Sequence, residues 1–160
     1  MPAFETTATL SVMAGSKSLD REAVLEPNGD VIRFGMHGGV AEHYRAVASD
    51  PQPSTLDYLA ASVGGCLIGT FAGSLLRARV PVVPGEALTA TTTGIVEPDE
   101  DGVLVLRRIV VDYTLALAPD HRDAATEVHA AHAARCPNAR SVNPAIAIET
   151  TLTFTDPSDG

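Results

Sequence analysis

The sequence predicts an α+β fold in a single domain over residues 1–160, with mostly antiparallel sheet and two helices. Three observations support this. Apolar and polar residues alternate near both ends and in the middle of the chain, as in half-buried strands. Residues 58–76 carry no charge, and residues 120–135 are rich in alanine, which favours helices. The predicted order is three strands, a helix, two strands, a helix and a final strand.

The first strands are predicted between residues 4 and 34. Apolar residues alternate with polar ones from Phe4 to Val12, the period of a strand with one buried face. Asn28-Gly29 lies between two short apolar runs and predicts a hairpin, because both residues tolerate the positive φ of a tight turn. Residues 37–53 are rich in glycine, proline and polar side chains and are predicted to form a surface loop.

The first helix is predicted to begin near residue 55. Ser54 followed by Asp57 is the S-x-x-D signature of a capping box, which satisfies free N–H groups at a helix start. The helix can continue to about Arg79, because Pro81 disfavours helical geometry in the residue before it. Gly64-Gly65 weakens the middle of this helix and predicts a kink there.

Residues 58–76 also have the length of a membrane span, with Arg77 and Arg79 as a positive flank. Against a span, the stretch holds four glycines besides serine and threonine, and it would separate strands that belong to one sheet system. We therefore interpret it as a buried core helix, and no membrane partner is expected. Its glycines at positions 65, 69 and 73, four apart, are typical of a closely packed helix face.

Two more strands are predicted over residues 86–97 and 103–117, joined by a turn at residues 97–102. Alternation in the second of them predicts one apolar face made of Val103, Val105, Ile109, Val111, Tyr113, Leu115 and Leu117. The second helix is predicted over residues 120–135, with Asp120 as its N-cap and its end at Cys136-Pro137. The last strand is predicted over residues 145–154, with alternating Ile146, Ile148, Leu152 and Phe154.

Composition limits which classes of molecule the protein is expected to bind and where it is expected to be located. The formal net charge of −9 excludes nucleic acid, since phosphate binding needs a basic surface. The N-terminus lacks the positive segment and apolar core of a signal peptide. Two cysteines are too few for a secreted disulfide framework in a chain of this size, so a cytoplasmic location is expected.

The two cysteines are the main candidates for chemistry. If the first helix bends at Gly64-Gly65, Cys66 lies in the first turn of its second half, where free N–H groups favour the reactive thiolate. A buried, inert cysteine is the alternative interpretation. Cys136 precedes Pro137 at a break in backbone geometry. A second thiol can trap the sulfenic acid of the first as a disulfide, although a permanent structural disulfide is a further alternative.

The sequence around each cysteine resembles one protein family. ASVGGCLIGTFAGSL (residues 61–75) and CPNARSV (residues 136–142) are similar to the two cysteine motifs of the OsmC/Ohr proteins, which are cysteine-based peroxidases. The predicted elements also follow the family's order over nearly the whole chain. Either motif alone is weak, whereas both together in this order are fairly specific.

The resemblance implies an OsmC-like intertwined homodimer in which mostly antiparallel sheets surround two central helices. It implies that Cys66 attacks a hydroperoxide, organic ones included, and becomes a sulfenic acid, which Cys136 then resolves as a disulfide. A dithiol reductant would complete the cycle, and no cofactor is implied. A non-catalytic protein of this fold, binding a small apolar or thiol ligand at the dimer interface, is the alternative.

The helpers of the reactive cysteine depart from the family pattern. The family's hydroperoxide-resistance branch has a glutamate ten residues before the first cysteine, where this chain has Leu56. Asp57 stands one position later and is a possible helper, but the capping box explains it equally well. The family's catalytic arginine falls in the turn after the first strand. The basic candidates in this chain are Lys17, Arg21, Arg33 and Arg45, each of which is also explained as a surface charge.

A metal site is an alternative role for part of this region. His129, His132 and Cys136 lie on neighbouring turns of the second helix and its end. Zinc needs a fourth ligand in a closed site, and no CxxC or HExxH motif supplies one, so no metal is predicted. His37 and His43, in the predicted loop, are no better candidates.

Overall fold

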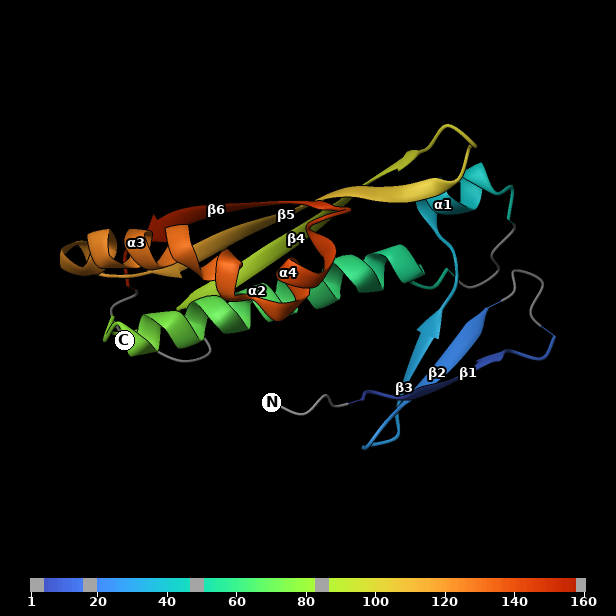
Figure 1. Cartoon of the computed structure of the whole chain (residues 1–160), viewed down its shortest axis with the longest axis horizontal. Helices are drawn as coiled ribbons and strands as arrows, with labels where there is room; N and C mark the ends of the chain where they lie inside the picture. The colour runs from blue at the N-terminus through green and yellow to red at the C-terminus, as the bar shows by residue number, and fades with distance from the viewer. Residues whose placement is uncertain (1–4, 16–19, 47–50, 83–86, 158–160) are drawn as a thin grey trace. The chain divides into compact units, whose positions relative to one another are not determined.

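The computed structural model describes residues 5–15, 20–46, 51–82 and 87–157. The chain divides into two compact units, residues 1–58 and 59–160, which are described separately below (Figure 1). Two three-stranded sheets and several helices confirm the α+β class. The prediction of one domain over residues 1–160 stays a prediction.

The sheet of the first unit is an antiparallel meander of β1 (Ala8–Val12), β2 (Arg21–Leu25) and β3 (Asp30–Phe34). The hairpin predicted at Asn28-Gly29 is confirmed. Leu25 pairs with Asp30, and the Gly29 N–H donates to the Leu25 carbonyl at 2.8 Å. Gly29 has φ +74°, the left-handed conformation for which glycine is suited.

β1 is a strand, as predicted, but its apolar side is not buried as predicted. Leu10 and Val12 are 66% and 60% exposed, so the apolar side of β1 is uncovered in this chain. Phe4, where the alternation begins, lies outside the described residues. The period-two pattern therefore identified a strand whose apolar face is not covered by the described residues.

The segment predicted as a surface loop contains a short helix, α1 (Gly38–His43). The Ala41 and Tyr44 N–H groups donate to the carbonyls of His37 and Val40, which closes its turns. The loop prediction is wrong here because Val40-Ala41-Glu42 can form one helical turn after Gly38-Gly39, a signal too short to outweigh the loop composition.

Helix α2 (Thr55–Arg77) begins at the predicted capping box. The Asp57 N–H donates to Ser54 Oγ at 3.3 Å, and the Ser54 N–H donates to Asp57 Oδ2 at 2.6 Å. α2 has the length and hydropathy to cross a membrane, with a mean hydropathy of 1.7 over its most apolar window. One side of it nevertheless forms core in the second unit, through the fully buried Val63, Leu67, Phe71 and Leu75.

The sheet of the second unit has the order β4 (Leu88–Pro98), β5 (Leu104–Ala116) and β6 (Ala147–Thr155). β4 pairs antiparallel with β5, whereas β6 pairs parallel with β5 after a helical crossover (Figure 1). The Tyr113 ring on β5 lies 5.0 Å from that of Phe71 on α2 and 5.3 Å from that of His132. Both helices that carry these rings therefore cover the same face of the sheet.

The predicted apolar face of β5 is correct only in its second half. Ile109, Val111, Tyr113, Leu115 and Leu117 are buried, but Val103 is 50% exposed and Leu106 is buried instead of Val105. A β-bulge causes this change. Ile95 pairs with Arg108 while Val96 pairs with Leu106, so Arg107 is an extra residue that reverses the alternation.

The region predicted as one Ala-rich helix is built from three consecutive elements, the 3₁₀ turn η1 (Pro119–His121), α3 (Arg122–His132) and the 3₁₀ turn η2 (Ala133–Arg135), and its predicted end at Cys136-Pro137 is confirmed. A further helix, α4 (Pro137–Val142), follows that the sequence did not predict. The prediction of Asp120 as N-cap is wrong, because Asp120 lies inside η1 and His121 occupies the cap of α3. The last strand is confirmed, with Ile148, Leu152 and Phe154 on its half-buried side.

Candidate active site

The second unit brings the two cysteines together. Cys66 lies in the middle of α2 and Cys136 is the N-cap of α4, and the Cys66 thiol is close enough to Cys136 to raise the pKa of that thiol. Neither cysteine is in a disulfide. Cys66 is half-buried, whereas Cys136 is completely buried. A reagent from solvent can therefore reach Cys66 before it reaches Cys136.

Two polar side chains hold this pair in place. Asn138 Nδ2 donates to the Ser62 carbonyl at 3.0 Å and so ties α4 to α2. The Thr70 hydroxyl donates to the Cys66 carbonyl at 2.8 Å and also interacts with the Cys136 side chain. The Asn138 hydrogen bond therefore holds the start of α4, and with it Cys136, against the part of α2 that carries Cys66.

Burial raises the pKa of the Cys136 thiol above its ordinary value. The Ala139 N–H, which lies 3.5 Å from Cys136 Sγ, acts in the opposite direction, and the neighbouring Cys66 raises the pKa further. The net direction is upward. Cys136 is thus held as a neutral thiol that can donate its proton toward the Cys66 sulfur.

The expectation that Cys66 lies at a helix start is wrong. α2 continues as one helix through Gly64-Gly65, so the backbone N–H groups around Cys66 are used inside the helix. Gly64 has a different role. An added Cβ there would overlap the Thr92 hydroxyl, and the glycine therefore lets α2 lie close against β4.

A buried cluster of aromatic and histidine side chains lies near Cys136 in the second unit. Tyr113 OH donates to His132 Nε2 at 3.0 Å, and His132 Nδ1 donates to the His129 carbonyl at 2.6 Å. Burial lowers the pKa of His132, and it raises the pKa of Tyr113, which the nearby Cys136 raises further. Both groups are thus neutral near pH 7.

The hydrogen bonds of His132 bear on the zinc alternative. Both ring nitrogens of His132 are engaged, so this side chain has no free lone pair for a metal. In the part of the chain that the structure describes, no group of three His, Cys, Asp or Glu side chains could hold a metal ion. His37 forms an ion pair with Asp57 in the first unit.

The proposed helpers of Cys66 lie in the first unit or outside the described residues. His37 Nε2 lies 2.8 Å from Asp57 Oδ2. Burial alone would raise the pKa of Asp57, but its hydrogen bonds to Ser54 and His37 outweigh this and hold the pKa below its usual value. Asp57 therefore acts structurally as a cap. Nine residues of helix separate it from Cys66, a rise of about 13 Å.

The basic candidates have different surroundings. Arg33 Nε lies 3.8 Å from Glu22 Oε2, and the Arg33 side chain is 60% exposed. Arg45 is exposed and has φ +52° just after α1. Arg21 Nε is buried and has no hydrogen-bond partner among the described residues. Lys17 lies outside the described residues.

Sequence reasoning did not assign a site role to Thr70, Asn138 or Tyr113. Helical spacing was a usable signal for Thr70, since it stands one turn after Cys66. Asn138 was visible only as part of the second cysteine motif. Tyr113 was predicted as core, and nothing in the sequence indicated that it pairs with His132 across the helix–sheet contact.

The comparisons with known proteins concern this same region and the whole fold. The family model described as OsmC-like protein matches residues 48–151, which include both cysteines. No curated protein sequence matches the chain.

Several solved structures are similar to it. An OsmC-like protein of unknown function from Vibrio cholerae is 15% identical, with a TM-score of 0.73, over 94% of this chain and 100% of that one. The organic hydroperoxide resistance protein OhrB of Bacillus subtilis is 14% identical, with a TM-score of 0.67, over 94% and 98%. An organic hydroperoxide resistance protein from Elizabethkingia anophelis is 16% identical, with a TM-score of 0.67, over 98% and 99%. At these identities the likeness concerns the fold.

Proposed function

Because the chain belongs to the OsmC-like protein family, we propose that it is a thiol-dependent peroxidase that reduces hydroperoxides, organic ones among them. Cys66 is the nucleophile and Cys136 the resolving thiol. The observation that carries the proposal is the contact between a half-buried Cys66 and a fully buried Cys136. Similarity to two organic hydroperoxide resistance proteins supports the substrate class.

The cycle balances with these two thiols and one external dithiol. The Cys66 thiolate attacks the distal oxygen of ROOH, the O–O bond breaks, and a proton yields ROH while Cys66 becomes a sulfenic acid. Cys136 sulfur then attacks the Cys66 sulfur, and the hydroxyl leaves as water with the Cys136 proton. A dithiol reduces the resulting disulfide and is itself oxidised.

The positions of the two thiols fit these roles. Peroxide from solvent reaches the half-buried Cys66 first. Cys136 is protonated because of its raised pKa, so it does not compete for peroxide and carries the proton that the resolving step releases as water. Asp57, Arg33, Arg45 and Lys17 remain candidate helpers, as does Arg21. A homodimer and a cytoplasmic location belong to the same proposal.

The test is peroxide turnover with an excess of dithiol. Cumene hydroperoxide and hydrogen peroxide are each mixed with the reduced protein, and consumption is followed for wild type, Cys66→Ser and Cys136→Ser. We expect Cys66→Ser to lose at least a thousandfold in rate, because the nucleophile is gone. Cys136→Ser should accumulate a Cys66 sulfenic acid that a dimedone label detects.

Mass spectrometry after brief exposure to peroxide supplies the second readout. Wild type should form a Cys66–Cys136 disulfide within one chain. Turnover that is equal in wild type and Cys66→Ser would refute the peroxidase, and turnover without any Cys66–Cys136 pairing would refute the two-cysteine cycle. Ser62→Ala is the matched control, because its hydroxyl lies on α2 and donates to the Leu59 carbonyl rather than to either thiol.

One observation favours the alternative of a non-catalytic binding protein for a small apolar or thiol ligand. Among the described residues of the second unit, the side chains that interact with the Cys136 thiol are Cys66, Thr70 and Tyr113, none of which supplies a positive charge. A peroxidase needs a cation or several donors to stabilise the departing alkoxide. Saturable ligand binding with no peroxide consumption by wild type would support the alternative.

A further inference from the structure

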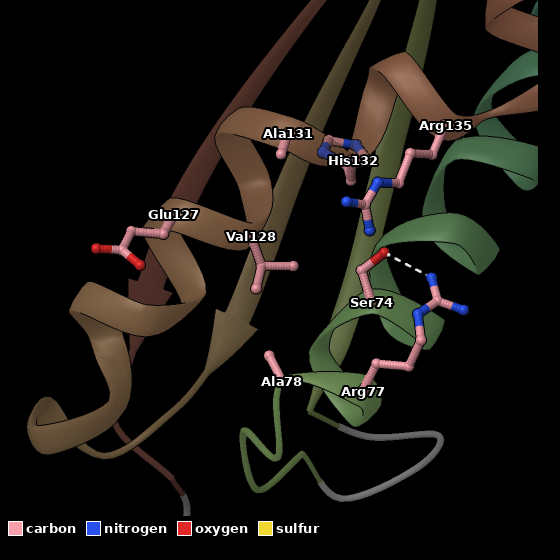
Figure 2. A pocket seen from close by; sticks show the side chains of 8 residues that line it. All are labelled: Ser74, Arg77, Ala78, Glu127, Val128, Ala131, His132 and Arg135. Carbon is pink, nitrogen blue, oxygen red and sulfur yellow. Dashed lines mark hydrogen bonds between the residues drawn. The ribbon is translucent and has the colours of Figure 1, made fainter.

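A pocket of about 340 Å³ lies in the second unit between the end of α2 and the α3–η2 segment (Figure 2). Neither cysteine lines it, although Arg135 in its lining directly precedes Cys136 in the chain. Ser74, its nearest residue to Cys66 along α2, is eight residues further on, a rise of about 12 Å. Its volume is at the lower end of the range for small-molecule sites, so it suits a small ligand.

Two arginines supply the charge of this pocket. Figure 2 shows the Arg135 side chain extending from η2 toward Ser74, and Arg77 on the last turn of α2. Arg77 donates to Ser74 Oγ at 3.1 Å. Arg135 has neither an ion pair nor a hydrogen bond from its guanidinium within the described residues. Its donors are therefore available to a ligand.

Ser74 adds a second, independent feature. Other hydroxyl groups on helices donate back to a backbone carbonyl, as those of Thr70 and Thr126 do. Ser74 Oγ is instead the acceptor for Arg77, and the residue is only 7% exposed. Its hydroxyl proton has no acceptor among the described residues, which leaves a nearly buried donor at the pocket wall.

The remaining lining fixes the charge and polarity of the ligand. Val128, Ala131 and Ala78 form an apolar wall. His132 is neutral, because burial lowers its pKa, and the Glu127 carboxylate points away from the two guanidinium groups in Figure 2. Two positive groups and one peripheral carboxylate leave an excess of about one positive charge, which suits a monoanion.

We propose that this pocket, lined by Arg77, Arg135 and Ser74, is a binding site for a small organic monocarboxylate with a short apolar tail. The planar guanidinium of Arg135 matches a carboxylate in two parallel hydrogen bonds, and Ser74 donates a third. The tail contacts Val128 and Ala131. The site uses no cysteine, so it stands or falls independently of the proposed peroxidase activity.

Calorimetry on the reduced full-length chain tests the site without any peroxide. The probes are sodium hexanoate, neutral hexanamide of the same shape, and inorganic phosphate, at constant ionic strength. We expect saturable binding of hexanoate, with hexanamide and phosphate each at least about tenfold weaker, because one lacks the charge and the other the tail. Hexanamide binding equal to hexanoate, or tighter phosphate binding, would overturn the proposal.

Variants locate the binding. Arg135→Gln and Arg77→Gln should each raise the Kd for hexanoate about tenfold or more. Arg107→Gln, which removes an exposed arginine on β5, should change it less than twofold. Amide chemical-shift changes of wild type with hexanoate should cluster at residues 74–78 and 127–135. Shifts confined to other segments, or equal effects of Arg135→Gln and Arg107→Gln, would show that the carboxylate does not bind here.

Discussion

At the scale of single residues, burial assigns different tasks to two cysteines that look alike in the sequence. Cys136 is fully buried and its pKa is raised, so it is a poor nucleophile toward peroxide in solution. Cys66, which lies close to it, is only half-buried. The order of events follows from this asymmetry, since the sulfenic acid forms first at the accessible sulfur and the protonated partner then resolves it.

His132 offers a residue-scale prediction about pH. Burial lowers its pKa in the fold, whereas in the unfolded chain it titrates at its ordinary value near 6.5. Below that pH the unfolded state binds a proton that the folded state does not, so stability is full above pH 6.5 and falls as the pH decreases toward the lowered folded pKa. The contribution of this one group is about 1 kcal/mol per pH unit within that window.

Thermal melts at pH 7.5 and pH 5.5 measure this effect. The wild type should lose stability between the two, and His132→Gln should lose less, because Gln carries no titrating group. His121→Gln changes an exposed histidine of η1 and should keep the wild-type dependence. Identical pH dependence in His132→Gln and wild type would mean that His132 does not titrate differently in the two states.

At the scale of elements, Gly64 sets the distance between α2 and β4. A Cβ at this position would overlap the Thr92 hydroxyl and approach the Thr92 Cβ to 3.0 Å. We expect Gly64→Ala to lower the free energy of unfolding by about 1–3 kcal/mol, even though alanine favours helix more than glycine does. Denaturant unfolding of the reduced protein measures the change.

A double-mutant cycle shows whether Thr92 is the cause. Thr92→Ala removes the overlapping hydroxyl and methyl, so Gly64→Ala should cost less in that background than in the wild type. Thr92→Ala alone is the control. An equal cost in both backgrounds would place the clash elsewhere, and a gain in stability from Gly64→Ala would show that helix propensity is decisive.

Elements specified by a few neighbouring residues were predictable from the sequence. Asn28-Gly29 predicted the hairpin, and Ser54 with Asp57 predicted the start of α2. Both signals depend only on neighbouring residues, through the positive φ of a tight turn and the free N–H groups at a helix start. The burial of β5 was not predictable along its whole length. Its alternation reverses at the extra residue Arg107, and a bulge depends on pairing with β4 rather than on local propensity.

The candidate site was also predictable from the sequence only in part. The motifs identified Cys66 and Cys136 as a pair by resemblance, whereas the hydrogen bond from Tyr113 to His132 joins a strand and a helix across a packed core. A kink was expected at Gly64-Gly65 because glycine weakens a helix. One of these two glycines, Gly64, is instead needed for the packing of α2 on β4. Both the Tyr113–His132 hydrogen bond and the role of Gly64 depend on tertiary contacts, which the sequence pattern does not reveal.

At the scale of the whole molecule, two apolar surfaces are uncovered in the single chain. On α2, a Cβ added at Gly65, Gly69 or Gly73 would have no described atom within 4 Å apart from the helix's own backbone, and Leu76 on the same side is 62% exposed. On β1, Leu10 and Val12 are also exposed. Monomeric proteins seldom leave such surfaces open, which supports the homodimer expected for this family.

The glycines of α2 allow the dimer to be tested. If two copies of α2 pack closely through this stripe, a large side chain at its centre keeps the helices apart, so we expect Gly69→Leu to shift the protein from dimer to monomer. Light scattering should give about twice 16.6 kDa for wild type and 16.6 kDa for Gly69→Leu. Ala124→Leu adds similar bulk at an exposed position of α3 and should stay dimeric. A wild-type protein that is monomeric at micromolar concentration would contradict the dimer, whereas a Gly69→Leu dimer would mean that the two copies meet through another surface, for which β1 is the next candidate.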